Sequence, residues 1–238
     1  WLWDRFGSAG VFGVIGAAIF AGFLLCRGFH FHDLSAELRT PFRQEKIRDL
    51  IYEKDALPAS VLEGFIALGS GAINPYLSVF LIQRAVLQTP GLFYTAQAAG
   101  TFSARLFVGR ISRRWGEAPI VYLSAIMFSL GILALTFSNI PLLVLAGAFL
   151  MGIGYGLTVT GFQIMSVRVV APERRGAASS TYSCGWDVFA ALGGLLSGTL
   201  ITVFSSYQTA FCLLILIYPV FVLVYVCKIS KHPSAFRN

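Results

Sequence analysis

Three ionisable residues lie inside stretches that are otherwise mostly apolar: Glu63, Arg105 and Asp187. An unpaired charge in hydrocarbon costs several kcal/mol, so such residues face a protein interior or a water-filled path and find partners there. Each lies about 9 to 15 Å along its predicted helix from one end, at the same side of the membrane. We expect Arg105 and Asp187 to form an ion pair and Glu63 to carry a transported proton. A purely structural ion pair is the alternative.

Amide and aromatic side chains in the same stretches could bind a small molecule: Asn74, Gln97, Tyr155, Gln163 and Trp186. Polar groups scattered among apolar walls suit a small amphipathic substrate, although each could equally make a contact between helices. We expect no metal site and no cofactor, because the histidines and cysteines lack ligand spacing. We also expect no enzyme. An intramembrane hydrolase is less favoured, since no apolar stretch contains a histidine to act as a base.

The chain is too apolar for a water-soluble domain: 56% of its 238 residues are hydrophobic and 12% are charged. Three uncharged runs have about the length needed to cross a bilayer, at 6–26, 119–137 and 210–227. Four further stretches are about as long but more polar, which suits helices that line an interior: 58–83, 91–111, 141–168 and 177–203. The sequence therefore predicts an all-α polytopic membrane protein with about seven transmembrane helices.

Lysine and arginine are unevenly distributed between the predicted loops. If the helices alternate in direction, one side holds 15 of the 18 basic residues, whereas the other holds Arg5 and Arg84. The positive-inside rule places the basic side, including the C-terminus, in the cytoplasm. The net charge of +7 then reflects topology and requires no nucleic-acid partner.

The longest interval between predicted spans, 27–57, reads as a cytoplasmic segment with one amphipathic helix. Thr40 can cap this helix and Pro41 can occupy its first turn. Its apolar residues gather on one side, which suits a helix lying on the membrane surface: Phe42, Ile47, Leu50 and Ile51.

Two motifs carry a family resemblance. The run RLFVGRISRRWG (105–116) resembles the loop between helices eight and nine of the major facilitator superfamily, and VAPERRGAASSTYS (170–183) resembles its turn between helices ten and eleven. The opening WLWDRF is similar to the start of helix six. The resemblance implies half of a twelve-helix bundle. Its expected parts are helix six (1–26), a cytoplasmic linker (27–57), the C-terminal six-helix bundle (58–228) and a cytoplasmic tail (229–238).

The resemblance also implies a cytoplasmic gate formed by the two motif loops. Its expected residues are Gly109, Arg110, Arg113, Arg114, Gly116, Glu173, Arg174 and Arg175. The family pattern has a carboxylate where this chain has Arg113, and that carboxylate is expected to contact the start of helix eleven and an arginine. Arg113 cannot accept those hydrogen bonds. Glu117 and Glu173 are the candidates to replace it.

The resemblance implies a secondary active transporter that works by alternating access, most like bacterial drug, sugar or opine-type efflux permeases. We expect proton-coupled export of a small amphipathic molecule across the plasma membrane, the bacterial inner membrane. Since the chain opens on Trp1 and six helices enclose one side of a cavity, we expect a fragment. Its expected partners are the lipid bilayer and a missing N-terminal six-helix half, or a second copy in a homodimer. A non-transporting membrane remnant or an assembly subunit is the alternative.

Overall fold

The computed structural model describes residues 2–27, 51–87 and 89–230. The chain divides into two units, Trp1–Gln44 and Glu45–Asn238. Every regular element in the described ranges is helical, as the sequence predicts. Most of the predicted amphipathic helix and nearly all of the predicted tail lie outside the described residues.

Helix α1 spans Leu2–Arg27 and belongs to the first unit. Gly7 interrupts it with φ 59° and ψ −160°, a conformation that residues with a side chain rarely adopt. From Gly7 to Arg27 the helix is 21 residues long and apolar enough to cross a membrane.

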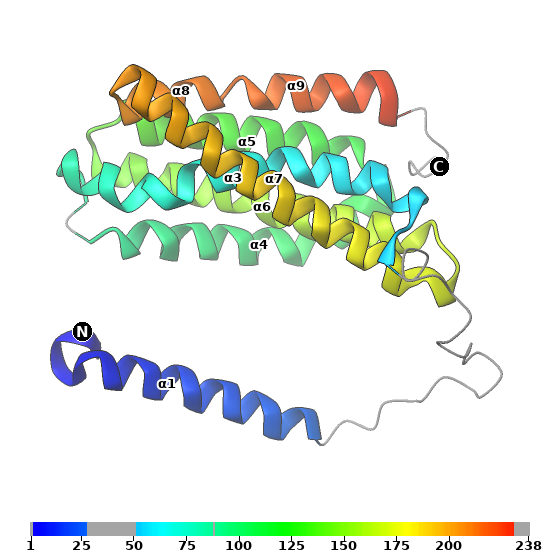
Figure 1. The fold of residues 1–238 in the computed structure, drawn as a ribbon, viewed down its shortest axis with the longest axis horizontal. Coiled ribbons are helices and arrows are strands. Elements are labelled where there is room, and N and C mark those ends of the chain that lie inside the picture. Colours follow the sequence, from blue (N-terminus) through cyan, green and yellow to red (C-terminus); the bar gives the residue numbers. More distant parts are fainter. Residues whose placement is uncertain (1, 28–50, 88, 231–238) are drawn as a thin grey trace. The chain divides into compact units, whose positions relative to one another are not determined.

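The second unit begins with a bundle of five long helices (Figure 1). These are α3 (Leu57–Gln83), α4 (Gly91–Trp115), α5 (Ala118–Phe137), α6 (Pro141–Arg168) and α7 (Arg175–Phe204). Short 3-10 turns, η2 (Lys54–Ala56) and η3 (Pro172–Arg174), precede α3 and α7. Prolines in the first turns of α3, α5 and α6 help to set where these helices begin, because a first-turn residue needs no intrahelical N–H bond.

The last predicted span, 210–227, is an interrupted helix. It consists of α8 (Tyr207–Leu214), α9 (Ile217–Val224) and a π-helical turn, η4 (Tyr225–Ile229). Pro219 has no N–H to donate to the carbonyl of Ile215, and the N–H of Tyr218 bonds that carbonyl at 3.2 Å instead. The proline thus accounts for the break between α8 and α9.

Six helical segments of the described residues are long and apolar enough to cross a membrane, and α4 is not among them. With 25 residues α4 is about 37 Å long, so its length suffices for a crossing. Its composition is too polar to meet the same criterion, because one of its faces carries Gln97, Thr101 and Arg105. The seventh predicted span therefore has the length but not the hydropathy of the others.

Glycines bring two pairs of parallel helices into close contact, α3 with α7 and α4 with α6. A Cβ on Gly152 of α6 would overlap the backbone carbonyl of Gln97 on α4, and one on Gly193 of α7 would overlap that of Leu68 on α3. The next residue of α7, Gly194, is less closely packed. A Cβ there would lie an ordinary 3.6 Å from the nearest atom.

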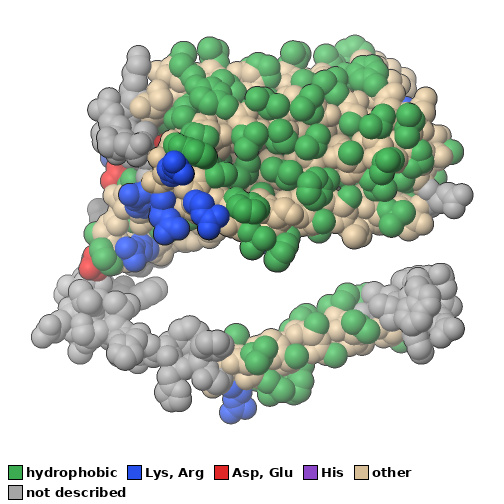
Figure 2. Space-filling model, turned by 180° about the vertical axis from the view of Figure 1, so that it is seen from behind, with side chains coloured by type: hydrophobic (Ala, Val, Ile, Leu, Met, Phe, Trp, Pro, Cys, Tyr) green, Lys and Arg blue, Asp and Glu red, His purple; other side chains and the backbone are tan. Residues whose placement is uncertain are grey.

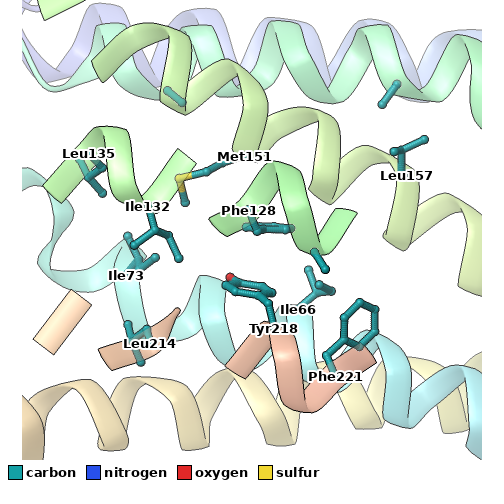
Figure 3. Packing of buried hydrophobic residues seen from close by; sticks show 14 of the residues in the cluster. Ile66, Ile73, Phe128, Ile132, Leu135, Met151, Leu157, Leu214, Tyr218 and Phe221 are labelled. Atoms are coloured by element: carbon teal, nitrogen blue, oxygen red, sulfur yellow. The ribbon is translucent and has the colours of Figure 1, made fainter. Parts of the chain in front are cut away.

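Aromatic rings of α5 and α9 lie together in the core (Figure 3), and a ring of α6 also contacts α9. The rings of Phe128 and Tyr218 stack with centroids 5.3 Å apart and planes at 11°. Phe221, one turn further along α9, meets Phe162 edge to face at 6.3 Å. These contacts hold the interrupted last helix against the bundle.

Hydrophobic side chains cover the flank of the second unit, and lysine and arginine gather at one of its ends (Figure 2). This basic end is formed by the start of α3, the ends of α4 and α6, the start of α7 and the end of η4. Its basic residues are Lys54, Arg110, Arg113, Arg114, Arg168, Arg174, Arg175 and Lys228. An apolar flank with most of the basic charge at one end is typical of a protein that crosses a bilayer.

Candidate functional site

Two neighbouring cavities contain most of the polar residues that the sequence singles out. The larger, which we call the arginine cavity, has a volume of about 450 Å³. It is lined by Ser70, Asn74, Tyr94, Gln97, Ala98, Thr101, Phe102, Arg105, Tyr155 and Trp186. Five of the eight predicted pathway residues thus share this space.

Helix α4 supplies the polar wall of the arginine cavity through one face. Tyr94, Gln97, Thr101 and Arg105 recur at intervals of three and four residues, which places them one above another. The adjoining face, with Gly100 among its buried residues, packs on α6. Tyr94 was missed in the sequence analysis, although this spacing could have revealed it.

Hydrogen bonds fix part of the wall and leave part of it open. The hydroxyl of Thr101 donates to the carbonyl of Gly152 at 3.1 Å, and the Tyr94 hydroxyl donates to the carbonyl of Asn74 at 3.3 Å. The Ser70 hydroxyl is buried and has no hydrogen-bond partner among the described residues. Arg105 is exposed, so its guanidinium is available to a ligand, and Ser70 lies in the wall of the same cavity.

The smaller cavity, which we call the carboxylate cavity, has a volume of about 250 Å³. It is lined by Glu63, Tyr155, Val159, Tyr182, Ser183, Trp186 and Asp187. Four of these residues come from one side of α7, at positions 182, 183, 186 and 187. No lysine, arginine or histidine lines this cavity among the residues that the structure describes.

Glu63 is completely buried in the wall of the carboxylate cavity. The phenol of Tyr182 lies close to it but donates its proton to the carbonyl of Val159 at 2.9 Å. Within the described ranges, neither carboxylate oxygen of Glu63 has a hydrogen-bond partner. A charge in this position would cost several kcal/mol, so a proton or a cation is needed to neutralise it.

The predicted ion pair between Arg105 and Asp187 is not formed within the part of the chain that the structure describes. The two residues line different cavities, and Tyr155 and Trp186 belong to the walls of both. Because α4 and α7 extend beyond their predicted ends, Arg105 and Asp187 lie about 15 and 18 Å from the basic end. Similar depth did not bring them together, since depth along a helix does not determine which way a side chain faces.

Gln163 is the one predicted pathway residue that lines neither cavity. Its side chain is exposed on α6, about two turns beyond Tyr155 toward the basic end.

The motif at 105–116 is helical up to Trp115 and does not form the predicted loop, because α4 continues to that residue. Arg113 and Arg114 lie in its last turn, where positive charge is favourable beside the free carbonyls. Gly116 ends the helix at φ 75° and ψ −156°, a backbone region open essentially to glycine. The connection to α5 is therefore only Gly116 and Glu117.

The other predicted gate segment receives a carboxylate from outside both motifs. Arg174 donates to a carboxylate oxygen of Glu53 at 2.8 Å and to the carbonyl of Tyr52 at 3.0 Å. The hydroxyl of Thr181 accepts from the N–H of Glu53 at 2.8 Å. The guanidinium of Arg174 holds the pKa of Glu53 below its ordinary value. The end of the predicted linker is thus fastened to the start of α7, whereas Glu173 and Arg175 are exposed.

Comparison with known proteins identifies the family. Residues 59–237 match the Major Facilitator Superfamily. The chain belongs to this superfamily. Its relatives include an uncharacterized Major Facilitator Superfamily (MFS)-type transporter of Burkholderia mallei (strain SAVP1), 28% identical over 149 residues, which are 62% of this chain and 37% of that protein. Another is the uncharacterized MFS-type transporter YvkA of Bacillus subtilis (strain 168), 32% identical over 162 residues, which are 59% of this chain and 36% of YvkA. The aligned region spans little more than a third of either relative.

Membership of the Major Facilitator Superfamily confirms the predicted family and agrees with the predicted all-α, multi-pass membrane fold. Both relatives are named as transporters. The two cavities lie within the matched region, because every residue that lines them falls between positions 59 and 237.

Proposed function

We propose that this chain forms one half of a secondary active transporter that exports a small amphipathic molecule in exchange for protons. The observation that carries the proposal is Glu63, a buried and unpartnered carboxylate in the wall of a cavity. In a membrane transporter, binding a proton or a cationic substrate lowers the free energy of such a residue, whereas an unpaired charge there is unfavourable. Alternation of Glu63 between a bound proton and a bound substrate provides a physical basis for coupling transport to the proton gradient.

None of the described side chains that face Glu63 carries a positive charge, so its negative charge can be neutralised only by a proton or cation in the cavity. From α6 it is faced by Tyr155, and from α7 by Tyr182 and Asp187. Asp187 carries the same charge, and the tyrosines are neutral. Arg105, the nearest described cation on the cavity walls, lies across the Tyr155–Trp186 pair in the arginine cavity.

The complete transporter needs a second half. Transporters of this fold work by rocking two six-helix halves around a central site, and the walls described above enclose one side of such a site. We propose that this chain acts together with an N-terminal six-helix half, or with a second copy of itself, in the bacterial plasma membrane. The basic end faces the cytoplasm in this proposal, because short loops rich in lysine and arginine stay on that side.

Transport by the complete protein, this chain together with its N-terminal half, tests the proposal. In everted membrane vesicles, an imposed proton gradient should drive accumulation of the substrate, and Glu63→Gln should abolish this dependence while leaving expression unchanged. Asp55→Asn is the matched control, because it removes a carboxylate that lies outside both cavities. Full proton-driven transport by Glu63→Gln would show that Glu63 is not the coupling residue. A complete protein that moves no compound under any gradient would favour an assembly subunit.

A further inference from the structure

The charges on the two cavities are divided by sign. Glu63 and Asp187 line the carboxylate cavity, and Arg105 lines the arginine cavity. Tyr155 and Trp186 stand between them as a shared wall. Tyr155 lines both cavities, so it borders the space of Glu63 and Asp187 on one side and that of Arg105 on the other.

Each cavity also has a buried polar group without a partner. In the carboxylate cavity this is Glu63, whose two oxygens are unbonded among the described residues. In the arginine cavity it is the Ser70 hydroxyl, which is 4% exposed and also unbonded there. Buried polar groups in folded proteins nearly always have a hydrogen-bond partner, and a ligand that occupies both cavities could supply one to each of these two groups.

We infer that the transported molecule is a zwitterion whose ammonium and carboxylate groups are held apart by an apolar body. The ammonium group binds in the carboxylate cavity at Asp187, the apolar body packs on the Tyr155–Trp186 pair, and the carboxylate binds Arg105 with Ser70 and the Gln97 amide beside it. This inference rests on the proposed function and specifies its substrate class.

The distribution of charge favours a zwitterion over a simple cation or anion. A cation held at Asp187 leaves the Arg105 charge and the Ser70 hydroxyl without partners. An anion held at Arg105 leaves the Asp187 carboxylate uncompensated. A zwitterion satisfies both ends, and its two charges cancel, so binding it leaves the net charge of the site unchanged. Arg105 and Asp187 are both exposed and therefore accessible, so a ligand that pairs with both gains two charge-assisted contacts where a cation or an anion gains one.

Three probes with one apolar body and different charges test the inference. The zwitterion is para-aminomethylbenzoate, the cation is para-aminomethylbenzamide and the anion is para-acetamidomethylbenzoate. Binding to the complete transporter in detergent is measured by isothermal titration calorimetry without any gradient. The zwitterion should bind at least about 10-fold more tightly than either single-charge probe, because each charge-assisted contact contributes at least that factor.

Two substitutions should each remove one half of this preference. Asp187→Asn should make the zwitterion bind no better than the anion, and Arg105→Gln should make it bind no better than the cation. Asp55→Asn and Lys228→Gln remove the same charges outside both cavities and should leave all three affinities unchanged. Thermal unfolding of every variant shows whether it is folded, and Asp187→Glu and Arg105→Lys should restore part of the preference if the charge is what matters.

The result that overturns the inference is equal binding of the three probes, or no binding of any of them at millimolar concentration. A loss of thermal stability in both variants without a change in preference would also overturn it, since the charges would then be structural. Failure of this binding test leaves the proton-coupling experiment on Glu63 unaffected. Conversely, the expected preference in a protein that shows no proton-driven transport would support the substrate class and contradict the coupling.

Discussion

Tyr155 and Trp186 meet edge to face, with ring centroids 5.5 Å apart and planes at 73°. One residue comes from α6 and the other from α7, and both belong to the walls of the two cavities. The pair therefore separates Arg105 from Asp187 and Glu63, which explains why residues of opposite charge at comparable depth do not form an ion pair.

Removing the aromatic partition should cost stability as well as function. Edge-to-face pairs contribute about 0.5–1.5 kcal/mol beyond the area that they bury. We expect Trp186→Ala to lower the free energy of unfolding in detergent by at least about 1 kcal/mol more than Trp115→Ala, which alters an exposed tryptophan. Trp186→Phe should recover most of the loss. Equal destabilisation by the two alanine variants would contradict the role of the pair.

Glu63 should destabilise the folded protein. Replacing an unpartnered buried carboxylate with an apolar side chain of similar size relieves its desolvation cost, so Glu63→Met should raise the free energy of unfolding by about 1–3 kcal/mol while abolishing proton coupling. Ser60→Ala is the contrast. The Ser60 hydroxyl is buried and donates to the carbonyl of Thr181 at 3.0 Å, so its loss should lower stability. Thermal unfolding of both variants in the same detergent decides, and a destabilised Glu63→Met would show that the carboxyl is satisfied in the folded protein.

The bond between Glu53 and Arg174 should be lost in acid. Arg174 lowers the pKa of Glu53 from its ordinary value of 4.5, so the stabilisation is fully present above that pH and disappears as pH falls through the lower folded value. The pair is partly exposed, and we expect it to contribute about 0.3–1 kcal/mol. Wild type and Glu53→Gln should therefore differ by a constant amount above about pH 5 and converge at lower pH. A difference that persists into strong acid would contradict this assignment.

Two glycines on α4 should respond oppositely to alanine. A Cβ on Gly100 would overlap the backbone carbonyl of Phe149, so Gly100→Ala should separate α4 from α6 and cost about 1–3 kcal/mol. No atom lies within 4 Å of a Cβ built on Gly109, so Gly109→Ala should leave stability unchanged or raise it by up to about 1 kcal/mol. Mild denaturant unfolding compares the two. A costly Gly109→Ala would mean that this motif glycine has a contact outside the described residues.

The sequence predicted most of the helices because their signals are local. Apolar runs of membrane-spanning length and prolines in first turns depend on neighbouring residues, and α6 begins and ends at the predicted positions, 141 and 168. The polar face of α4 was also predictable in part, since its spacing follows the helical period. These signals do not require knowledge of how the helices pack.

The missed features depend on helix rotation and on distant contacts. Gly193 and Gly194 are adjacent in the sequence, and only the rotation of α7 decides which of them packs more closely on α3. Glu53 and Arg174 are 121 residues apart, so no local pattern connects them. The end of α4 was predicted too early because three arginines close together are typical of a loop between membrane spans. In the last turn of a helix, however, arginines are stabilised by the free backbone carbonyls.

The negative and positive charges of the two cavities lie on different helix pairs, α3 with α7 and α4 with α6. Glu63 and Asp187 are carried by α3 and α7, whereas Arg105 is carried by α4, which packs along α6. Within each pair, backbone lies against backbone and leaves little room for sliding. A displacement of one pair against the other would therefore change the gap between Arg105 and Asp187 while leaving the contacts inside each pair intact. The distance between Arg105 and Asp187 therefore depends on how the two helix pairs are arranged. A molecule that binds both charges can bind only in those arrangements in which this distance matches its own length.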